Sequence, residues 1–179
     1  INVMTKACFK ASKVLIRDFG EIEKLQVSLK GPGDFVTASD KKVEKILIEE
    51  LQKARPDYGI LSEEKGKIEN KESEFKWIID PIDGTKNFFY GHPHYSIVLG
   101  LTYGDKIIAG FTYDPNRKEI FHAVQNQGFF INDKKFNVSN KVQFNNCFLS
   151  AEIPGSGIGL SLIHISEPTR PRLNTYAVF

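Results

Sequence analysis

The hydrophobic period of this sequence changes near Pro56, and that change constrains the fold more than any other feature. Before it, apolar residues recur at helical spacing over 5–19 and again over 43–54, which predicts two amphipathic helices. Thr37 or Ser39 is the expected N-cap of the second helix, because a short polar side chain there can accept a bond from a free backbone N–H. Pro56 ends that helix.

After Pro56 the apolar runs are short and are separated by turn signals. Strands are expected over residues 58–61, 76–79, 95–103, 106–113, 119–123 and 129–131. Glycine, asparagine and proline residues stand between the last four runs, as they do in β-hairpins. Two helices followed by an antiparallel meander predict an α+β fold, in which a layered helix pair covers a largely antiparallel sheet. The charged stretch 64–76 is expected to be a solvated, mobile loop.

Composition predicts an ordinary soluble protein. The 179 residues are 41% hydrophobic and 26% charged with a net charge of +2, so neither nucleic acid nor a membrane surface is an expected partner. Cys8 and Cys147 lie far apart and near no histidine cluster, which argues against zinc and for a reducing compartment. Since no apolar run is long enough to span a bilayer, we expect a cytoplasmic protein.

Acidic residues follow two of the expected strands. Glu63 and Glu64 end the run "LSEE", and Asp80 and Asp83 end the run "WIIDPID". If neighbouring strands end at the same edge, three or four carboxylates meet there, and a hard cation relieves their repulsion. Oxygen ligands without a nearby Cys or His favour Mg²⁺ over zinc or copper. The alternative is an ordinary turn, because Asp-Pro-x-Asp-Gly is built from residue types that are common in turns.

The residues that follow Asp80 add to the hypothesis of a cation site. The backbone carbonyl of Ile82 is a candidate ligand, because Pro81 restricts the local backbone. Gly84 leaves room for a phosphate group near main-chain N–H groups. The hydroxyl of Thr85 can orient a water molecule.

The segments "DFVTASDKKVEKIL", "ILSEE" and "WIIDPIDGTKNF", in this order and spacing, resemble the inositol monophosphatase family, and in particular its bacterial inositol-1-monophosphatase branch. The resemblance continues through "GFTYDPNRKEIFHAVQNQGFFINDKK" and covers the N-terminal portion of the family pattern, about residues 1–159. It implies an inositol monophosphatase or sugar phosphatase-like fold with its C-terminal half missing. It also implies a Mg²⁺-dependent, lithium-sensitive phosphatase in which water hydrolyses inositol-1-phosphate to inositol and phosphate without a covalent intermediate.

The same resemblance implies roles for individual residues. The implied metal ligands are Glu63, Asp80, the carbonyl of Ile82 and Asp83. The implied catalytic residues are Glu63 and Thr85, which orient the attacking water, and Asp40, which supports the threonine. The implied substrate contacts are Asp83, Gly84, Thr85 and Lys30. For Asp40 a second interpretation stays open, as a residue of the first helical turn that interacts with the helix dipole.

Two positions depart from the pattern of the family within the matching segments. Ser62 stands where glycine is common, and Lys86 replaces a small or polar residue. Neither change removes an oxygen ligand. We expect Lys86 to face solvent.

The resemblance ends near Gly159. Residues 160–179 match nothing in the family, and "SLIHISEPTRP" resembles translated sequencing-adapter read-through, so we expect this tail to be artefactual or disordered. A divergent authentic tail is the alternative. The second half of the family pattern carries a further metal-binding aspartate and the region that selects the substrate. Residues 1–159 are therefore expected to form an incomplete, metal-binding phosphatase domain with impaired activity.

Other functions remain compatible with these residues. One alternative is a bisphosphate nucleotidase or a histidinol-phosphate phosphatase of the same superfamily. Another is a non-catalytic protein-binding fragment, because members of this family also act through protein partners in transcription. In every enzymatic interpretation the partner is a small phosphorylated substrate, and the resemblance allows a homodimer of the full-length protein.

Overall fold

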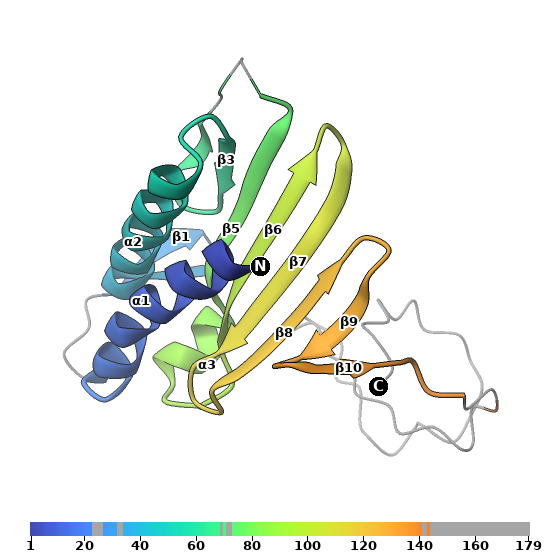
Figure 1. Cartoon of the computed structure of the whole chain (residues 1–179). Helices are drawn as coiled ribbons and strands as arrows, with labels where there is room; N and C mark the ends of the chain where they lie inside the picture. The colour runs from blue at the N-terminus through green and yellow to red at the C-terminus, as the bar shows by residue number, and fades with distance from the viewer. Residues whose placement is uncertain (23–26, 32–33, 69, 71–72, 141–142, 144–179) are drawn as a thin grey trace. The chain divides into compact units, whose positions relative to one another are not determined.

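The computed structural model describes residues 1–22, 27–31, 34–68, 70, 73–140 and 143. The chain divides into two units, Ile1–Phe136 and Asn137–Phe179. All of the described helices and strands belong to the first unit (Figure 1). In the second unit, the described residues 137–140 and 143 form neither helix nor strand. The tail 160–179 lies outside the described residues, so its predicted nature stays a prediction.

Two long helices pack against each other, as the sequence predicts. They are α1 (Asn2–Phe19) and α2 (Ala38–Ala54). The predicted cap at Ser39 is wrong, because Ser39 lies inside α2 and its hydroxyl donates a hydrogen bond to Asp18 Oδ2 at 2.7 Å. The side chain of Thr37, the other candidate cap, lies outside the described residues.

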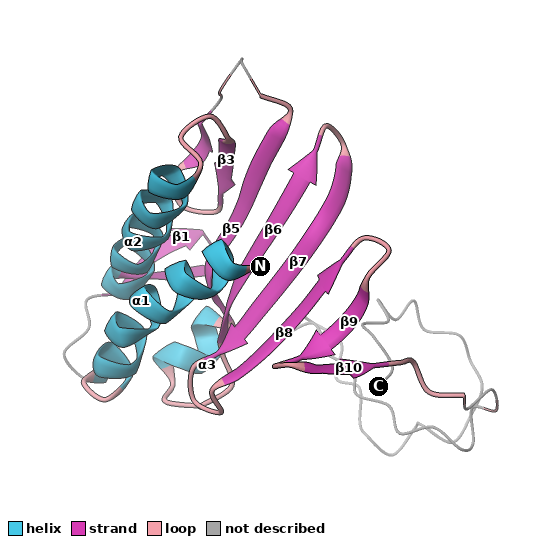
Figure 2. Cartoon of the chain, viewed as in Figure 1, coloured by secondary structure: helices cyan, strands magenta, loops and turns pink. Residues whose placement is uncertain are grey.

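One sheet of eight strands forms the other layer of the first unit (Figure 2). Its strands are β3 (Gly59–Ser62), β4 (Gly66–Ile68), β5 (Phe75–Asp83), β6 (Ser96–Tyr103), β7 (Lys106–Asp114), β8 (Glu119–Val124), β9 (Gly128–Ile131) and β10 (Lys134–Phe136). They are ordered β10-β9-β8-β7-β6-β5-β3-β4, and every neighbouring pair is antiparallel except β3 and β5. The predicted α+β class is confirmed.

Several short elements are absent from the sequence-based prediction. The stretch 64–76 is not entirely loop, because Gly66–Ile68 forms β4 and pairs with β3. This strand has only three residues and carries no hydrophobic alternation, so its pattern is too short to recognise. The strand β1 (Val27–Gly31), the helix α3 (Thr85–Phe89) and β10 are also additions. The strand β1 pairs antiparallel with β2 (Asp34–Thr37).

The core lies between the helix pair and one face of the sheet. Alternate residues of β5 point into it, with Trp77 and Ile79 buried between half-exposed neighbours. Leu47 and Leu51 of α2 are fully buried in the same hydrophobic cluster. Over the described part of the chain, no helix combines the length and the apolar character that crossing a bilayer requires.

Candidate active site

A backbone irregularity at the end of β5 sets the directions of Asp80 and Asp83. In a regular strand, residues three apart point to opposite faces of the sheet. Here Asp80 pairs with Val98 and Asp83 pairs with Ser96, and the register shifts between them. Since the two partners are two residues apart on β6, the bulge turns both aspartates to the same face. The Ser96 hydroxyl also donates a hydrogen bond to Asp83 Oδ2 at 3.4 Å.

Glu63 reaches this place from the neighbouring strand. The strands β3 and β5 run parallel, and Ser62 at the end of β3 pairs with Ile79. The backbone N–H of Glu63 donates to the carbonyl of Ile79 at 3.2 Å, which places Glu63 beside Asp80. The strands β3 and β5 thus end at the same edge of the sheet. That their acidic residues form one cation site stays a prediction.

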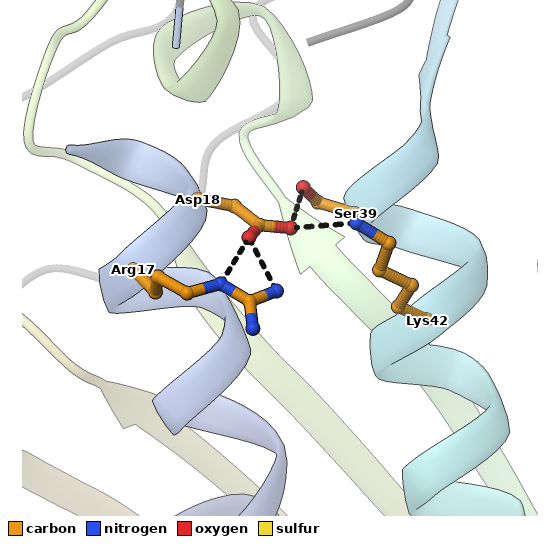
Figure 3. A network of polar contacts seen from close by, with 4 residues as sticks. All are labelled: Arg17, Asp18, Ser39 and Lys42. Carbon is orange, nitrogen blue, oxygen red and sulfur yellow. Dashed lines mark hydrogen bonds and ion pairs between the residues drawn. The ribbon is translucent and has the colours of Figure 1, made fainter. Parts of the chain in front are cut away.

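Asp40 approaches from the first turn of α2, where it is 3% exposed. The start of this helix is held by Asp18 at the end of α1 (Figure 3). One oxygen of Asp18 accepts from Ser39 at 2.7 Å and lies 3.5 Å from the Lys42 ammonium. The other oxygen accepts from Arg17 Nη2 and Nε at 2.7 and 2.9 Å. The residue before Asp40 is thereby fixed to α1.

The carboxyl group of Asp80 is surrounded by acidic groups. Burial raises the pKa of Asp80 to about 7, and the charges of Glu63, Asp83 and Asp40, in that order, act in the same direction. A hydrogen bond between the Asp80 and Glu63 carboxyl groups contributes as well. Asp80 Oδ1 is buried and has no hydrogen-bond partner among the residues that the structure describes. This oxygen therefore needs a proton or a cation to be stable at neutral pH.

The turn after β5 presents Gly84 and Thr85. Gly84 has φ +85°, a conformation that residues with a Cβ rarely adopt, and a Cβ there would lie 2.9 Å from the carbonyl oxygen of His94. The short helix α3 begins directly after it. The Thr85 hydroxyl donates to the carbonyl of Ile82 at 2.8 Å, so its lone pairs are left to accept from a ligand.

These residues fit a hard cation by the chemistry of their donors. Among the side chains that the structure describes, no three of Asp, Glu, His and Cys come together tightly enough to enclose a metal ion. Mg²⁺ does not require such an enclosure, because it keeps several waters and is commonly held by one or two carboxylates and a substrate phosphate. The unpartnered Oδ1 of Asp80 and the second lone pair of the Ile82 carbonyl are suitable oxygen ligands.

The remaining predicted residues are placed only in part. Lys30 belongs to β1, at an irregularity in its pairing with β2, and its side chain lies outside the described ones. The strand β2 contacts α3, so this two-stranded sheet stands next to the turn at Gly84. Lys86 is exposed, as expected.

Sequence reasoning missed Glu44, which is 1% exposed on α2. Its Oε1 accepts hydrogen bonds from the Ser62 hydroxyl and from the backbone N–H groups of Glu64 and Lys65, the last two at 3.1 and 2.9 Å. The signal was an acidic residue within the apolar face of the helix, three residues before Leu47. A charge at such a position is rare unless it has partners.

Comparisons with known proteins agree with the resemblance of the matching segments. A model of the inositol monophosphatase family matches residues 1–159. An inositol-1-monophosphatase from Mesorhizobium japonicum is 42% identical over 159 residues, which are 89% of this chain and 60% of that protein. A Nus factor SuhB from Pasteurella multocida is 38% identical over 154 residues, covering 86% and 58%. The chain thus spans about 60% of the length of these relatives.

Solved structures share the fold. The extragenic suppressor protein suhB from Bartonella henselae superposes with a TM-score of 0.79 at 44% identity, over 82% of this chain and 57% of that one. An IMPase/NADP phosphatase solved with Mg²⁺ and phosphate gives a TM-score of 0.66 at 25% identity, over 79% and 54%.

Proposed function

The chain belongs to the inositol monophosphatase family, and from that premise we propose that residues 1–159 are the metal-binding part of a Mg²⁺-dependent phosphate monoester hydrolase. The observation that carries the proposal is Asp80, whose buried Oδ1 has no partner in the described part of the chain and which faces three other carboxylates. A bound cation would give Oδ1 a partner and would also reduce the repulsion among the carboxylates. The solved relative with Mg²⁺ and phosphate supports the choice of metal.

The proposed ligands of Mg²⁺ are Glu63, Asp80, Asp83 and the carbonyl of Ile82. A cation held there would lower the pKa of water and neutralise charge on the phosphate and the leaving oxygen. Two of these ligands lie on one face because of the β5 bulge, and Glu63 is added by the parallel pairing with β3. The site therefore depends on the sheet and not on one contiguous motif.

The reaction itself is a direct attack of water on phosphorus, with no covalent intermediate. Glu63 accepts a hydrogen bond from the attacking water, and Thr85 accepts another through its free lone pairs. Asp40 is proposed to support Thr85 in this role. Gly84 has no Cβ, so the phosphate can approach the backbone N–H groups after the turn. Lys30 is proposed to balance the charge of the phosphate.

The preferred substrate in this proposal is inositol-1-phosphate, which is supported by the name of the relative that is 42% identical. A bisphosphate nucleotide and histidinol phosphate are the alternatives within the same chemistry. The second candidate function is protein binding in transcription, supported by the relative named Nus factor SuhB. The acidic cluster around Asp80 favours the enzyme, because a protein-binding surface does not require a carboxyl group that is partly withdrawn from solvent and faces other acidic groups.

The test uses a chimera in which residues 1–159 are joined to the part of the M. japonicum protein that this chain does not cover. With Mg²⁺ the chimera should hydrolyse inositol-1-phosphate and be inhibited by Li⁺. Asp83→Asn should lower kcat by about 100-fold or more, since even residues that only support metal ligands contribute 10–100-fold. Asp105→Asn, in the exposed turn between β6 and β7, is the matched control.

Near-normal activity of the Asp83→Asn chimera would show that the ligand set is wrong. The 179-residue chain itself should turn over less than about one hundredth as fast as the chimera, because a ligand and the substrate-selecting region are expected elsewhere in the family pattern. Removal of residues 160–179 should change neither the fold nor this low activity. Equal turnover by the chain and the chimera would contradict the proposed division at residue 159.

A further inference from the structure

Glu44 is a buried carboxylate whose surroundings point to a role at the proposed site. It is 1% exposed on α2, on the same side of the helix as the core residues Leu47 and Leu51. Burying a carboxylate is unfavourable unless hydrogen bonds replace its contacts with water. The partners of Glu44 therefore show what this acidic group does in the protein.

All three of its observed partners belong to one turn. Oε1 accepts from the hydroxyl of Ser62, from the N–H of Glu64 at 3.1 Å and from the N–H of Lys65 at 2.9 Å. These donors lie immediately before and after Glu63. Bonds between backbone N–H groups and a carboxylate are charge-assisted and stronger than neutral ones. The turn that carries Glu63 is thus attached to α2 on both sides of that residue.

The attachment to α2 fixes the backbone of Glu63, from which its side chain reaches the Asp80 carboxyl group. The Glu63 side chain is exposed, so close packing does not fix it. Its own N–H donates to the carbonyl of Ile79 at 3.2 Å, which fixes Glu63 to β5. Glu44 fixes the residues of the turn on either side of Glu63. A ligand has to be held within about 0.5 Å of its working position to bind well, and such precision requires a supporting shell of hydrogen bonds.

We infer that Glu44 is a positioning residue, which holds the turn 62–65 so that Glu63 faces Asp80 and Asp83. The inference rests on the proposed function for the role of Glu63, whereas the attachment of the turn rests on the hydrogen bonds alone. Asp40 lies one helical turn before Glu44 on α2. The helix α2 therefore positions Asp40 directly, and it positions Glu63 through the hydrogen bonds between Glu44 and the backbone of the turn. The hydroxyl of Ser62 supplies one of the three bonds.

The test compares two substitutions of Glu44 in the 179-residue chain. Glu44→Gln keeps an oxygen acceptor in the same place, and Glu44→Met keeps the volume without an acceptor. Ser62→Ala removes one donor and serves if Glu44→Met does not fold. Leu51→Ala, on the same buried face two turns away, is the control for loss of stability alone. Asp83→Asn and Glu63→Gln report on the proposed ligands.

Two measurements separate positioning from stability. Amide hydrogen exchange without metal reports the turn directly, and Mn²⁺ titration followed by electron paramagnetic resonance reports the affinity of the site. Glu44→Met should speed exchange at Glu64 and Lys65 by about 10-fold or more and weaken Mn²⁺ binding by about 10–100-fold. Glu44→Gln should stay within about 3-fold of the parent chain in both. Leu51→Ala should lower the melting temperature without a selective effect on the turn.

Four results would overturn the inference. Exchange at the turn unchanged by both Glu44→Met and Ser62→Ala would show that Glu44 does not hold it. Equal effects of Glu44→Met and Leu51→Ala on exchange and on Mn²⁺ affinity would show a merely structural role. If Asp83→Asn and Glu63→Gln bind Mn²⁺ as tightly as the parent chain, the proposed ligand set fails and the inference fails with it. Loss of binding in those two variants, with normal binding by Glu44→Met, overturns the inference alone.

Discussion

Asp18 and Asp80 are both aspartates that are withdrawn from solvent, and their surroundings are opposite. Asp18 receives hydrogen bonds from Arg17 and Ser39 and an ion pair from Lys42. Burial alone would raise the pKa of Asp18, but these bonds and charges outweigh it and hold the pKa below its ordinary value. Asp80 faces three acidic groups instead, and burial together with their charges raises its pKa to about 7.

The difference separates a carboxylate that supports the fold from one that is suited to bind a ligand. The negative charge of Asp18 is neutralised within the protein, so this residue stabilises the contact between α1 and α2. The charge of Asp80 is not neutralised by the residues described around it, and a folded chain tolerates such a group mainly where a proton or a cation joins it. Burial alone therefore does not distinguish a carboxylate that supports the fold from one that is suited to bind a ligand. The partners of each carboxylate do distinguish them.

The largest expected effect is on stability without metal, where substitutions of the two aspartates should act with opposite sign. Asp18→Ala should lower the free energy of unfolding by about 2 kcal/mol, chiefly because the buried Ser39 hydroxyl loses its charged acceptor. Asp80→Asn should raise that free energy, because it removes one of four repelling acidic groups. Urea unfolding of the chelator-treated chain measures both.

The control for this pair is Asp105→Ala in the exposed β6–β7 turn, which should stay within about 0.5 kcal/mol of the parent chain. A destabilised Asp80→Asn variant would contradict the comparison, since it would mean that Asp80 has stabilising partners of the kind that Asp18 has.

The pH dependence of stability should also be opposite for the two residues. The folded pKa of Asp80, about 7, lies above the value of about 3.9 in an unfolded chain, so the folded state holds the extra proton between these values. The contribution of Asp80 is therefore present at low pH and is lost as the pH rises from about 4 through 7. For Asp18, whose folded pKa is lowered, the contribution is present above about 4 and is lost as the pH falls below it.

Melting temperatures from pH 5 to 8 in the presence of a chelator test the Asp80 half of this prediction. The parent chain should lose stability with rising pH by a few degrees more than Asp80→Asn does. Mg²⁺ should reduce that loss, because a bound cation stabilises the ionised form. Parallel curves for the two proteins would show that Asp80 does not titrate in this range.

The smallest expected difference is between two glycine substitutions, one of which alters the backbone that presents the acidic cluster. Gly84→Ala places a Cβ 2.9 Å from the His94 carbonyl oxygen at φ +85°, whereas Gly104→Ala meets a positive φ of +55° with no atom within 4 Å. Both pay the strain of a left-handed residue, about 1–2 kcal/mol. Because of the steric contact, Gly84→Ala should be about 1 kcal/mol less stable than Gly104→Ala. Equal losses in thermal unfolding would mean that the β5 turn relaxes freely.

The main elements of the fold are predictable from the sequence because they have long periodic patterns. The face of α2 repeats every three to four residues, and the strands β6 and β7 are long apolar runs bounded by turn residues. The three-residue strands β4 and β10 carry too few residues to show a period. Ser39 resembles a cap by residue type, and only the approach of Asp18 from α1 shows that its hydroxyl is used elsewhere.

The sequence by itself determined the chemistry available at the site: four acidic residues at strand ends, a glycine that tolerates a positive φ, and no neighbouring thiol. Tertiary structure decided how these groups meet. The β5 bulge turns Asp80 and Asp83 to one face, and the parallel pairing of β3 with β5 adds Glu63. Residue type fixes which atoms can donate or accept, but pKa and direction depend on neighbours that are distant in the chain. For that reason Asp18 and Asp80, alike in sequence, differ in the folded protein.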